Sequence, residues 1–190
     1  MSETPPPPPP PPPGQYGGAP PPSAGPPGGT RPAELMDRFL ARLIDGVGFG
    51  IVYGIIYGIL GAIFLSGFYN SRGELFVFYL FLQVFSVAVY IGYNAWFESN
   101  KGATIGKQIM KLKVIGPDGE SNPTLQQAAI RSSFQALGLI SIVPIVGPFL
   151  GTIAFIGAVI FIAVTINNDT VSRQGWHDKL AGGTTVLKIG

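Results

Sequence analysis

Long apolar runs are the feature that most constrains how this chain folds. Leu43–Gly67 is apolar apart from Asp45, and Leu75–Phe97 and Phe149–Ile166 are runs of the same kind. A helix needs about 20 predominantly apolar residues to cross a bilayer. Only 12% of the residues are charged, against about 25% in soluble domains. We therefore predict a multi-pass integral membrane protein in a lipid bilayer.

The amino-terminal residues have a different composition. Pro5 to Pro13 is an unbroken proline run, and further prolines follow it. Such sequence favours extended polyproline II and cannot bury a core. We predict a disordered proline-rich tail over residues 1–31 and a membrane domain over 32–190. Two interpretations of the tail stay open, a solvated spacer and a docking strand for a polyproline-binding partner.

The membrane domain is predicted to be all-α, a bundle of about four membrane-embedded helices. Apolar runs and helix breakers place them at about 32–67, 75–97, 125–142 and 149–166. Pro32 fits a first helical position, and Thr124 with Gln127 matches a capping box. The breakers Pro144, Gly147 and Pro148 supply the turn between the last two helices.

Short β-prone runs lie outside these helices. Leu112–Ile115 follows a stretch whose isoleucines at 105 and 109 fit a short amphipathic helix, and Thr184–Ile189 lies near the carboxyl end. We predict that Lys111–Ile115 pairs with Thr184–Lys188 as a small cytosolic β-pair. An isolated pair is marginal, so the membrane surface or neighbouring helices must support it.

The distribution of Lys and Arg favours one topology. If residues 125–166 cross the membrane twice, both termini and the 98–123 loop share a side. That side then holds ten of the twelve basic residues, namely Arg31, Arg38, Arg42, Lys101, Lys107, Lys111, Lys113, Arg173, Lys179 and Lys188. Basic residues concentrate on the cytoplasmic side, so we predict a plasma-membrane protein with both termini cytosolic. A single crossing, which exposes three of the ten outside, is the alternative.

Small residues recur at every fourth position of the first apolar run. They are Gly46, Gly50, Gly54, Gly58 and Ala62. Such a stripe lets another helix approach closely, which drives association in lipid. Its partner is either another helix of the same bundle or another integral membrane protein subunit.

Four charged residues lie in or beside the apolar runs: Arg38, Asp45, Arg131 and Asp178. Charge at membrane depth is costly and marks a functional site by default. The predicted topology brings these residues to one face, where we expect one electrostatic cluster. For Asp45, two interpretations remain: an interfacial ion pair that fixes helix depth, and a cation or proton site.

Several chemistries are excluded by composition and spacing. The chain has no cysteine and one histidine, so we expect no disulfide, no metal site and no cofactor. A net charge of +2 gives no nucleic-acid footprint. Gly102–Lys107 lacks the spacing of a P-loop, and His177-Asp178 lacks a nearby nucleophile. We expect the protein not to be an enzyme.

Three stretches in order resemble the RDD family of small membrane proteins, and a proline tail before them is similar to the proline-rich antigens of actinobacteria. The stretches are Arg38-Phe-Leu-Ala-Arg-Leu-Ile-Asp45, Gly102-Ala-Thr-Ile-Gly-Lys107 with Leu112-Lys-Val-Ile115, and Gly175-Trp-His-Asp178-Lys-Leu-Ala-Gly182. The resemblance maps the family's Arg to Arg38 and its two Asp to Asp45 and Asp178. Ile105 stands where the family usually has Pro.

Two functions from different classes follow. The small-residue stripe, the tail and the small size favour a non-catalytic accessory or assembly subunit of a larger membrane complex, for example a respiratory one. The alternative is a cation/proton antiporter or small transporter that uses Asp45, an activity to which the resemblance to the family points.

Overall fold

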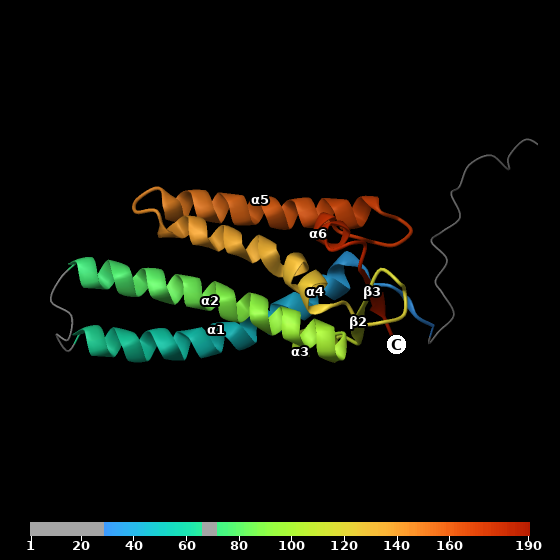
Figure 1. Cartoon of the computed structure of the whole chain (residues 1–190), viewed down its shortest axis with the longest axis horizontal. Helices are drawn as coiled ribbons and strands as arrows, with labels where there is room; N and C mark the ends of the chain where they lie inside the picture. Colours follow the sequence, from blue (N-terminus) through green and yellow to red (C-terminus); the bar gives the residue numbers. More distant parts are fainter. Residues whose placement is uncertain (1–28, 66–71) are drawn as a thin grey trace, which may run out of the picture.

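The structure is a computed structural model that describes residues 29–65 and 72–190. Four long helical segments run side by side, and their connections alternate between two ends (Figure 1). They are α1 (Leu35–Leu65), α2 (Arg72–Lys101), α4 (Leu125–Ser132) continuing into the 3₁₀ helix η1 (Ser133–Ile142), and α5 (Gly147–Asn168). Most of the tail predicted over 1–31 lies outside the described residues.

Three of these helices, α1, α2 and α5, are long and apolar enough to cross a membrane, among the residues that the structure describes. Their outer faces carry many exposed apolar side chains, such as Ile51, Phe81 and Ile153. A soluble monomer rarely exposes so much contiguous apolar surface. The described fold is therefore that of a multi-pass membrane protein.

The remaining segment, α4 followed by η1, differs from the single α-helix predicted over 125–142. Its first eight residues are α-helical and begin with the predicted capping box, in which Thr124 and Gln127 bond reciprocally. The next ten form a 3₁₀ helix, which rises about 2.0 Å per residue and so covers more length than an α-helix would. Gln83 of α2 donates to the Gly138 carbonyl at 3.1 Å, so η1 is bonded to α2.

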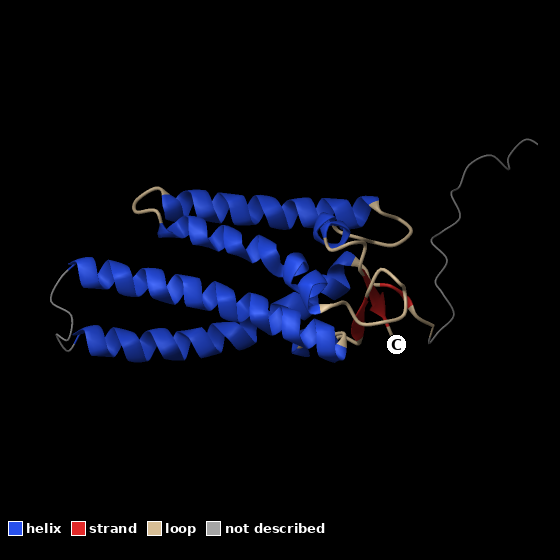
Figure 2. Ribbon diagram, viewed as in Figure 1, coloured by secondary structure: helices blue, strands red, loops and turns tan. Residues whose placement is uncertain are grey.

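Small elements gather at the end of the bundle that holds the C-terminus (Figure 2). They are β1 (Arg31–Pro32), α3 (Ile105–Ile109), β2 (Leu112–Ile115), α6 (Trp176–Leu180) and β3 (Thr185–Lys188). The strands form an antiparallel sheet in the order β1-β3-β2. The sheet covers a small core of Ala33, Ala41, Leu112, Val114 and Val186.

The predicted pairing of these strands is confirmed, with Leu112 opposite Lys188 and Ile115 opposite Thr185. The predicted two-stranded form is wrong, because Arg31–Pro32 adds a third strand. Pro32 is therefore a strand residue and not the first residue of a helix, and α1 begins at Leu35. Proline suits an edge strand because it has no N–H to donate.

Candidate functional site

Five charged side chains form one buried chain of alternating sign at this end of the bundle. Arg38 binds Asp178 at 2.8 Å, and Asp178 binds Arg131 at 2.8 Å. Arg131 also binds Glu98 at 2.8 Å, and Glu98 pairs with Lys107. The two carboxylates are nearly inaccessible, with side-chain exposures of 0% for Asp178 and 1% for Glu98. The network therefore joins α1, α2, α3, α4 and α6.

Local structure fixes Asp178 at the centre of this network. Its carboxylate accepts a hydrogen bond from the Gly175 N–H at 3.0 Å, which closes the first turn of α6. Its carbonyl accepts from the N–H groups of Gly183 and Thr184 in the turn before β3. The short helix α6 thus holds one carboxylate at a fixed place between two arginines.

Asp45 lies apart from the network, which corrects the prediction of a single four-residue cluster. Its carboxylate accepts hydrogen bonds from Thr104 Oγ1 at 2.6 Å, the Gly106 N–H at 2.8 Å and Tyr93 Oη at 3.0 Å. No arginine or lysine binds it among the described residues. These three donors satisfy the carboxylate, so Asp45 joins α1 to α3 without a basic partner.

The stretch Gly102–Lys107 has a structural explanation in these contacts. Gly102 has a φ of +70°, which L side chains rarely adopt. Gly106 packs so closely on α1 that a Cβ there would lie 2.1 Å from the Ala41 carbonyl oxygen. Thr104 caps α3 and Lys107 reaches Glu98. The motif therefore seats α3 on α1 and delivers a lysine to the network.

The comparison with protein-family models matches residues 32–182 to the RDD family. This chain belongs to the RDD family. RDD proteins are membrane proteins, which agrees with the apolar helices described above. Neither the comparison with curated proteins nor that with solved structures finds a match. Of the family residues mapped from the sequence, Arg38 and Asp178 bind each other, and Asp45 binds the neighbouring α3.

Burial and neighbouring charges shift the pKa values of three groups in and beside the ion-pair network. Burial alone would raise the pKa of Asp178, but the positive charges of Arg131 and Arg38 hold it well below its ordinary range. Burial lowers the pKa of Lys107 to about 8, with Arg131 and Arg42 acting in the same direction against Glu98. Burial also lowers the pKa of His177 to about 3, so its ring is neutral at pH 7.

Arg42 stands beside the network with a different set of partners. Its guanidinium donates to Tyr90 Oη at 2.9 Å and Asn94 Oδ1 at 3.0 Å. It also lies 5.7 Å from the ring centres of Tyr90 and Phe134. No carboxylate binds Arg42 in the described part of the chain. Its hydrogen-bond partners and the rings beside it are therefore neutral.

The structure shows no candidate metal-binding site among residues 29–65 and 72–190. That part of the chain holds no group of three or more His, Asp or Glu residues arranged to bind an ion. Asp178 and Glu98 instead direct their carboxylates at arginine and lysine.

The small-residue stripe of α1 is uncovered. All five of its members are exposed, and a Cβ added at any of its four glycines would meet nothing within 4 Å. The side of α1 that contacts α2 instead uses aromatic residues, since Tyr53 Oη donates to the Ser86 carbonyl and Phe49 lies against Tyr90. The stripe therefore does not pack on another helix of the described bundle.

Proposed function

We propose that this RDD protein is a non-catalytic accessory or assembly subunit that packs on a larger complex in the plasma membrane. The observation that carries the proposal is the open small-residue face of α1, Gly46 to Ala62. Respiratory assemblies are one class of host that would offer a helix of suitable length.

Contact with lipid does not explain why this face of α1 consists of small residues. Glycine costs a helix about 1 kcal/mol relative to alanine, and lipid tails pack equally well on larger side chains. A second helix gains from small residues because the two backbones then approach closely and make many van der Waals contacts. Four glycines at one face of α1 are therefore accounted for by a partner helix.

The ion-pair network suits this role because it anchors the presenting helix. Arg38 in the second turn of α1 is tied to α6 through Asp178, and Asp45 is tied to α3. Beyond this end, α1 meets the rest of the bundle mainly through side chains such as Tyr53. One end of α1 is thus held rigidly while its far half presents the open face.

Two observations support a non-catalytic role. Asp178 commits both carboxylate oxygens to arginines, and its neighbour His177 is buried and neutral. A catalytic base must instead reach a substrate proton.

One observation favours the alternative function of an antiporter. Asp45 is a buried carboxylate within a candidate membrane span. Its three hydrogen-bond donors favour the structural role.

The proposed orientation places both termini in the cytosol. The ten basic residues counted above lie in β1, the start of α1, the 98–123 connection and the segment after α5. These segments share one end of the bundle (Figure 1). The turn at 143–146 lies at the other end and contains no basic residue. Since basic residues concentrate on the cytoplasmic side, this arrangement supports placing the end of the bundle with the ion-pair network in the cytosol.

The experiment is purification of the full chain in mild detergent with identification of the proteins that accompany it. Gly54→Leu lies on the open face, and Gly48→Leu is the matched control, because a Cβ at Gly48 also meets nothing within 4 Å. Gly48 lies about 120° around the helix axis from Gly54. We expect Gly54→Leu to lose a membrane partner that wild type and Gly48→Leu retain. The same partners in all three samples would overturn the proposal.

A further inference from the structure

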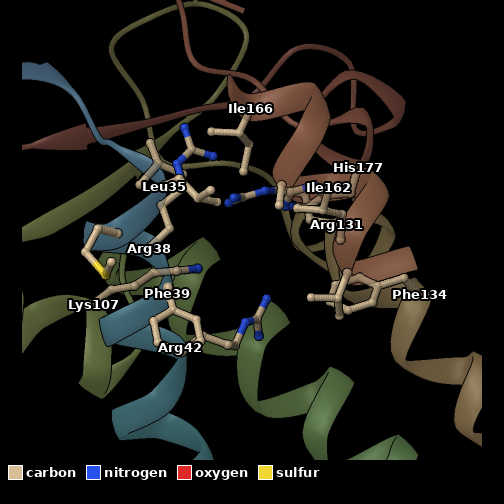
Figure 3. Close-up of a pocket in the computed structure, with 14 residues that line it drawn as sticks. Leu35, Arg38, Phe39, Arg42, Lys107, Arg131, Phe134, Ile162, Ile166 and His177 are labelled. Atoms are coloured by element: carbon tan, nitrogen blue, oxygen red, sulfur yellow. The ribbon is translucent and has the colours of Figure 1, made fainter. Parts of the chain in front are cut away.

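A cavity of about 430 Å³ lies beside the ion-pair network, between the start of α1 and the end of α5. Figure 3 shows the residues that line it, drawn from α1, α3, α4, η1, α5 and α6 among others. Its volume falls within the range of about 300–1,000 Å³ typical of small-molecule sites. One wall is cationic, the rest is mostly apolar, and none of the lining residues is acidic.

The cationic wall carries more positive charges than there are carboxylates paired with it. Four lining residues are basic: Arg38, Arg42, Lys107 and Arg131. Only two carboxylates pair with them, Asp178 and Glu98, which lie behind the wall. Four positive and two negative charges leave a formal excess of two. A buried excess of this kind is costly without an anion.

Arg42 is the side chain best placed to bind such an anion. Its partners are the neutral oxygens of Tyr90 and Asn94, as described above. The charged ends of Lys107 and Arg131, labelled with Arg42 in Figure 3, both bind the Glu98 carboxylate, so of these three only Arg42 lacks a carboxylate partner among the described residues. An arginine fork matches the oxygens of a phosphate, which it binds with two parallel hydrogen bonds.

Several apolar residues that line the cavity are exposed on the surface of the bundle. Met36 and Phe39 are 63% and 58% exposed, and Val159 is 43% exposed. All three belong to helices that are candidate membrane spans. A ligand that enters here therefore passes hydrocarbon-like surface before it reaches the cationic wall.

We propose that this cavity binds an anionic phospholipid of the surrounding bilayer. Its phosphate contacts Arg42 and the cationic wall, and the upper part of one acyl chain lies along Phe39 and Val159. Basic pockets between membrane helices bind anionic head groups in this way. A zwitterionic lipid fits less well, because its ammonium group would meet like charges. The proposal is independent of the assembly role.

The lowered pKa of Lys107 agrees with this assignment. Burial and the positive charges of Arg131 and Arg42 all make its charged form less stable. A bound phosphate would oppose these effects and raise the pKa again. A bound anion would therefore stabilise the charged form of Lys107, which burial and the two arginines destabilise.

The test is native mass spectrometry of the purified full chain titrated with phosphatidylglycerol, phosphatidylcholine or inorganic phosphate. Arg42→Gln removes the charge without leaving a buried carboxylate unpaired, because no carboxylate binds Arg42 among the described residues. Lys101→Gln is the matched control, because Lys101 is an exposed cation in the last turn of α2 and does not line the cavity. Ala163→Phe fills the cavity from α5 without changing charge.

We expect wild type and Lys101→Gln to bind phosphatidylglycerol more tightly than phosphatidylcholine. Arg42→Gln should raise the apparent Kd about tenfold, the effect of one lost charge-assisted hydrogen bond. Ala163→Phe should weaken binding as well, which covers the case in which Arg42→Gln fails to fold. Equal binding of both lipids, equal loss in Arg42→Gln and Lys101→Gln, or displacement of lipid by inorganic phosphate would each overturn the proposal.

Discussion

Arg131 and Asp178 are 47 positions apart in the sequence and bind each other through two guanidinium nitrogens, at 2.9 and 2.8 Å. Both side chains are buried, with exposures of 5% and 0%. The contact joins the last turn of α4 to α6 and so connects the membrane bundle to the small elements at its end. It is the central contact of the ion-pair network.

Asp178→Asn should destabilise the protein strongly. Removing one partner of a buried ion pair typically costs about 3–5 kcal/mol, because the other charge is left uncompensated. Here both Arg38 and Arg131 lose a carboxylate. The measurement is thermal unfolding in detergent, with Glu34→Gln as control because that side chain is 59% exposed. Equal stability of Asp178→Asn and Glu34→Gln would show that the network is not structural.

Stability should fall as the pH is lowered from 7 to 5, because of His177. Burial lowers its pKa from 6.5 to about 3 in the folded protein. Between these values the unfolded chain binds a proton that the folded protein does not, so acid favours unfolding. The effect of this one group from pH 7 to 5 is about 2 kcal/mol. Asp178 contributes little in this range, since its lowered pKa matters only in stronger acid.

His177→Gln serves as the comparison for this pH dependence, because glutamine does not titrate. Chemical denaturation of both proteins at pH 7 and pH 5 gives the two differences in unfolding free energy. We expect the difference to be smaller in His177→Gln by about 2 kcal/mol. The same pH dependence in both proteins would mean that folding does not shift the pKa of His177.

Asp45→Asn separates the subunit and antiporter interpretations. The asparagine keeps only one oxygen for three donors, Tyr93, Thr104 and the Gly106 N–H. One unsatisfied buried donor costs about 1–3 kcal/mol, so a lower melting temperature is expected. The subunit proposal predicts no ion-dependent proton flux in vesicles for either wild type or variant. Wild-type flux that disappears in a normally folded Asp45→Asn would establish the antiporter instead.

Single cysteines test the orientation, because the natural chain has none. Val171 after α5 and Ile145 in the opposite turn are 81% and 86% exposed. A membrane-impermeant maleimide applied to intact cells should label Ile145→Cys and should label Val171→Cys only after permeabilisation. The reverse pattern would place the network end outside the cell.

Parts of this fold were predictable because their signals are local. The strands Leu112–Ile115 and Thr185–Lys188 are short β-prone runs, and the capping box at Thr124 needs only two residues three positions apart. The third strand was missed because Pro32 before an acidic turn is typical of a helix start. The 3₁₀ helix was missed because apolar residues fill η1 without a period that separates it from an α-helix.

The site was predictable only in part because its pairing depends on tertiary contacts. Arg38, Arg131 and Asp178 meet because their elements share one end of the bundle. Glu98 and Lys107 were missed, although a carboxylate near the end of an apolar run with a lysine nine positions later is a usable signal. Asp45 was misassigned because the Thr104 and Gly106 donors reach it only once α3 packs on α1.

Crosslinking in native membranes tests the assembly role most directly. A cysteine at Gly54 lies on the open face of α1, and a cysteine at Gly48 is also exposed. The two positions are about 120° apart around the helix axis. Both variants are treated with a short thiol-to-amine or photoactivated crosslinker, and the products are identified by mass spectrometry. The account predicts a product between Gly54→Cys and a different membrane protein, absent with Gly48→Cys. No product at either position, or only a dimer of this chain, would contradict it.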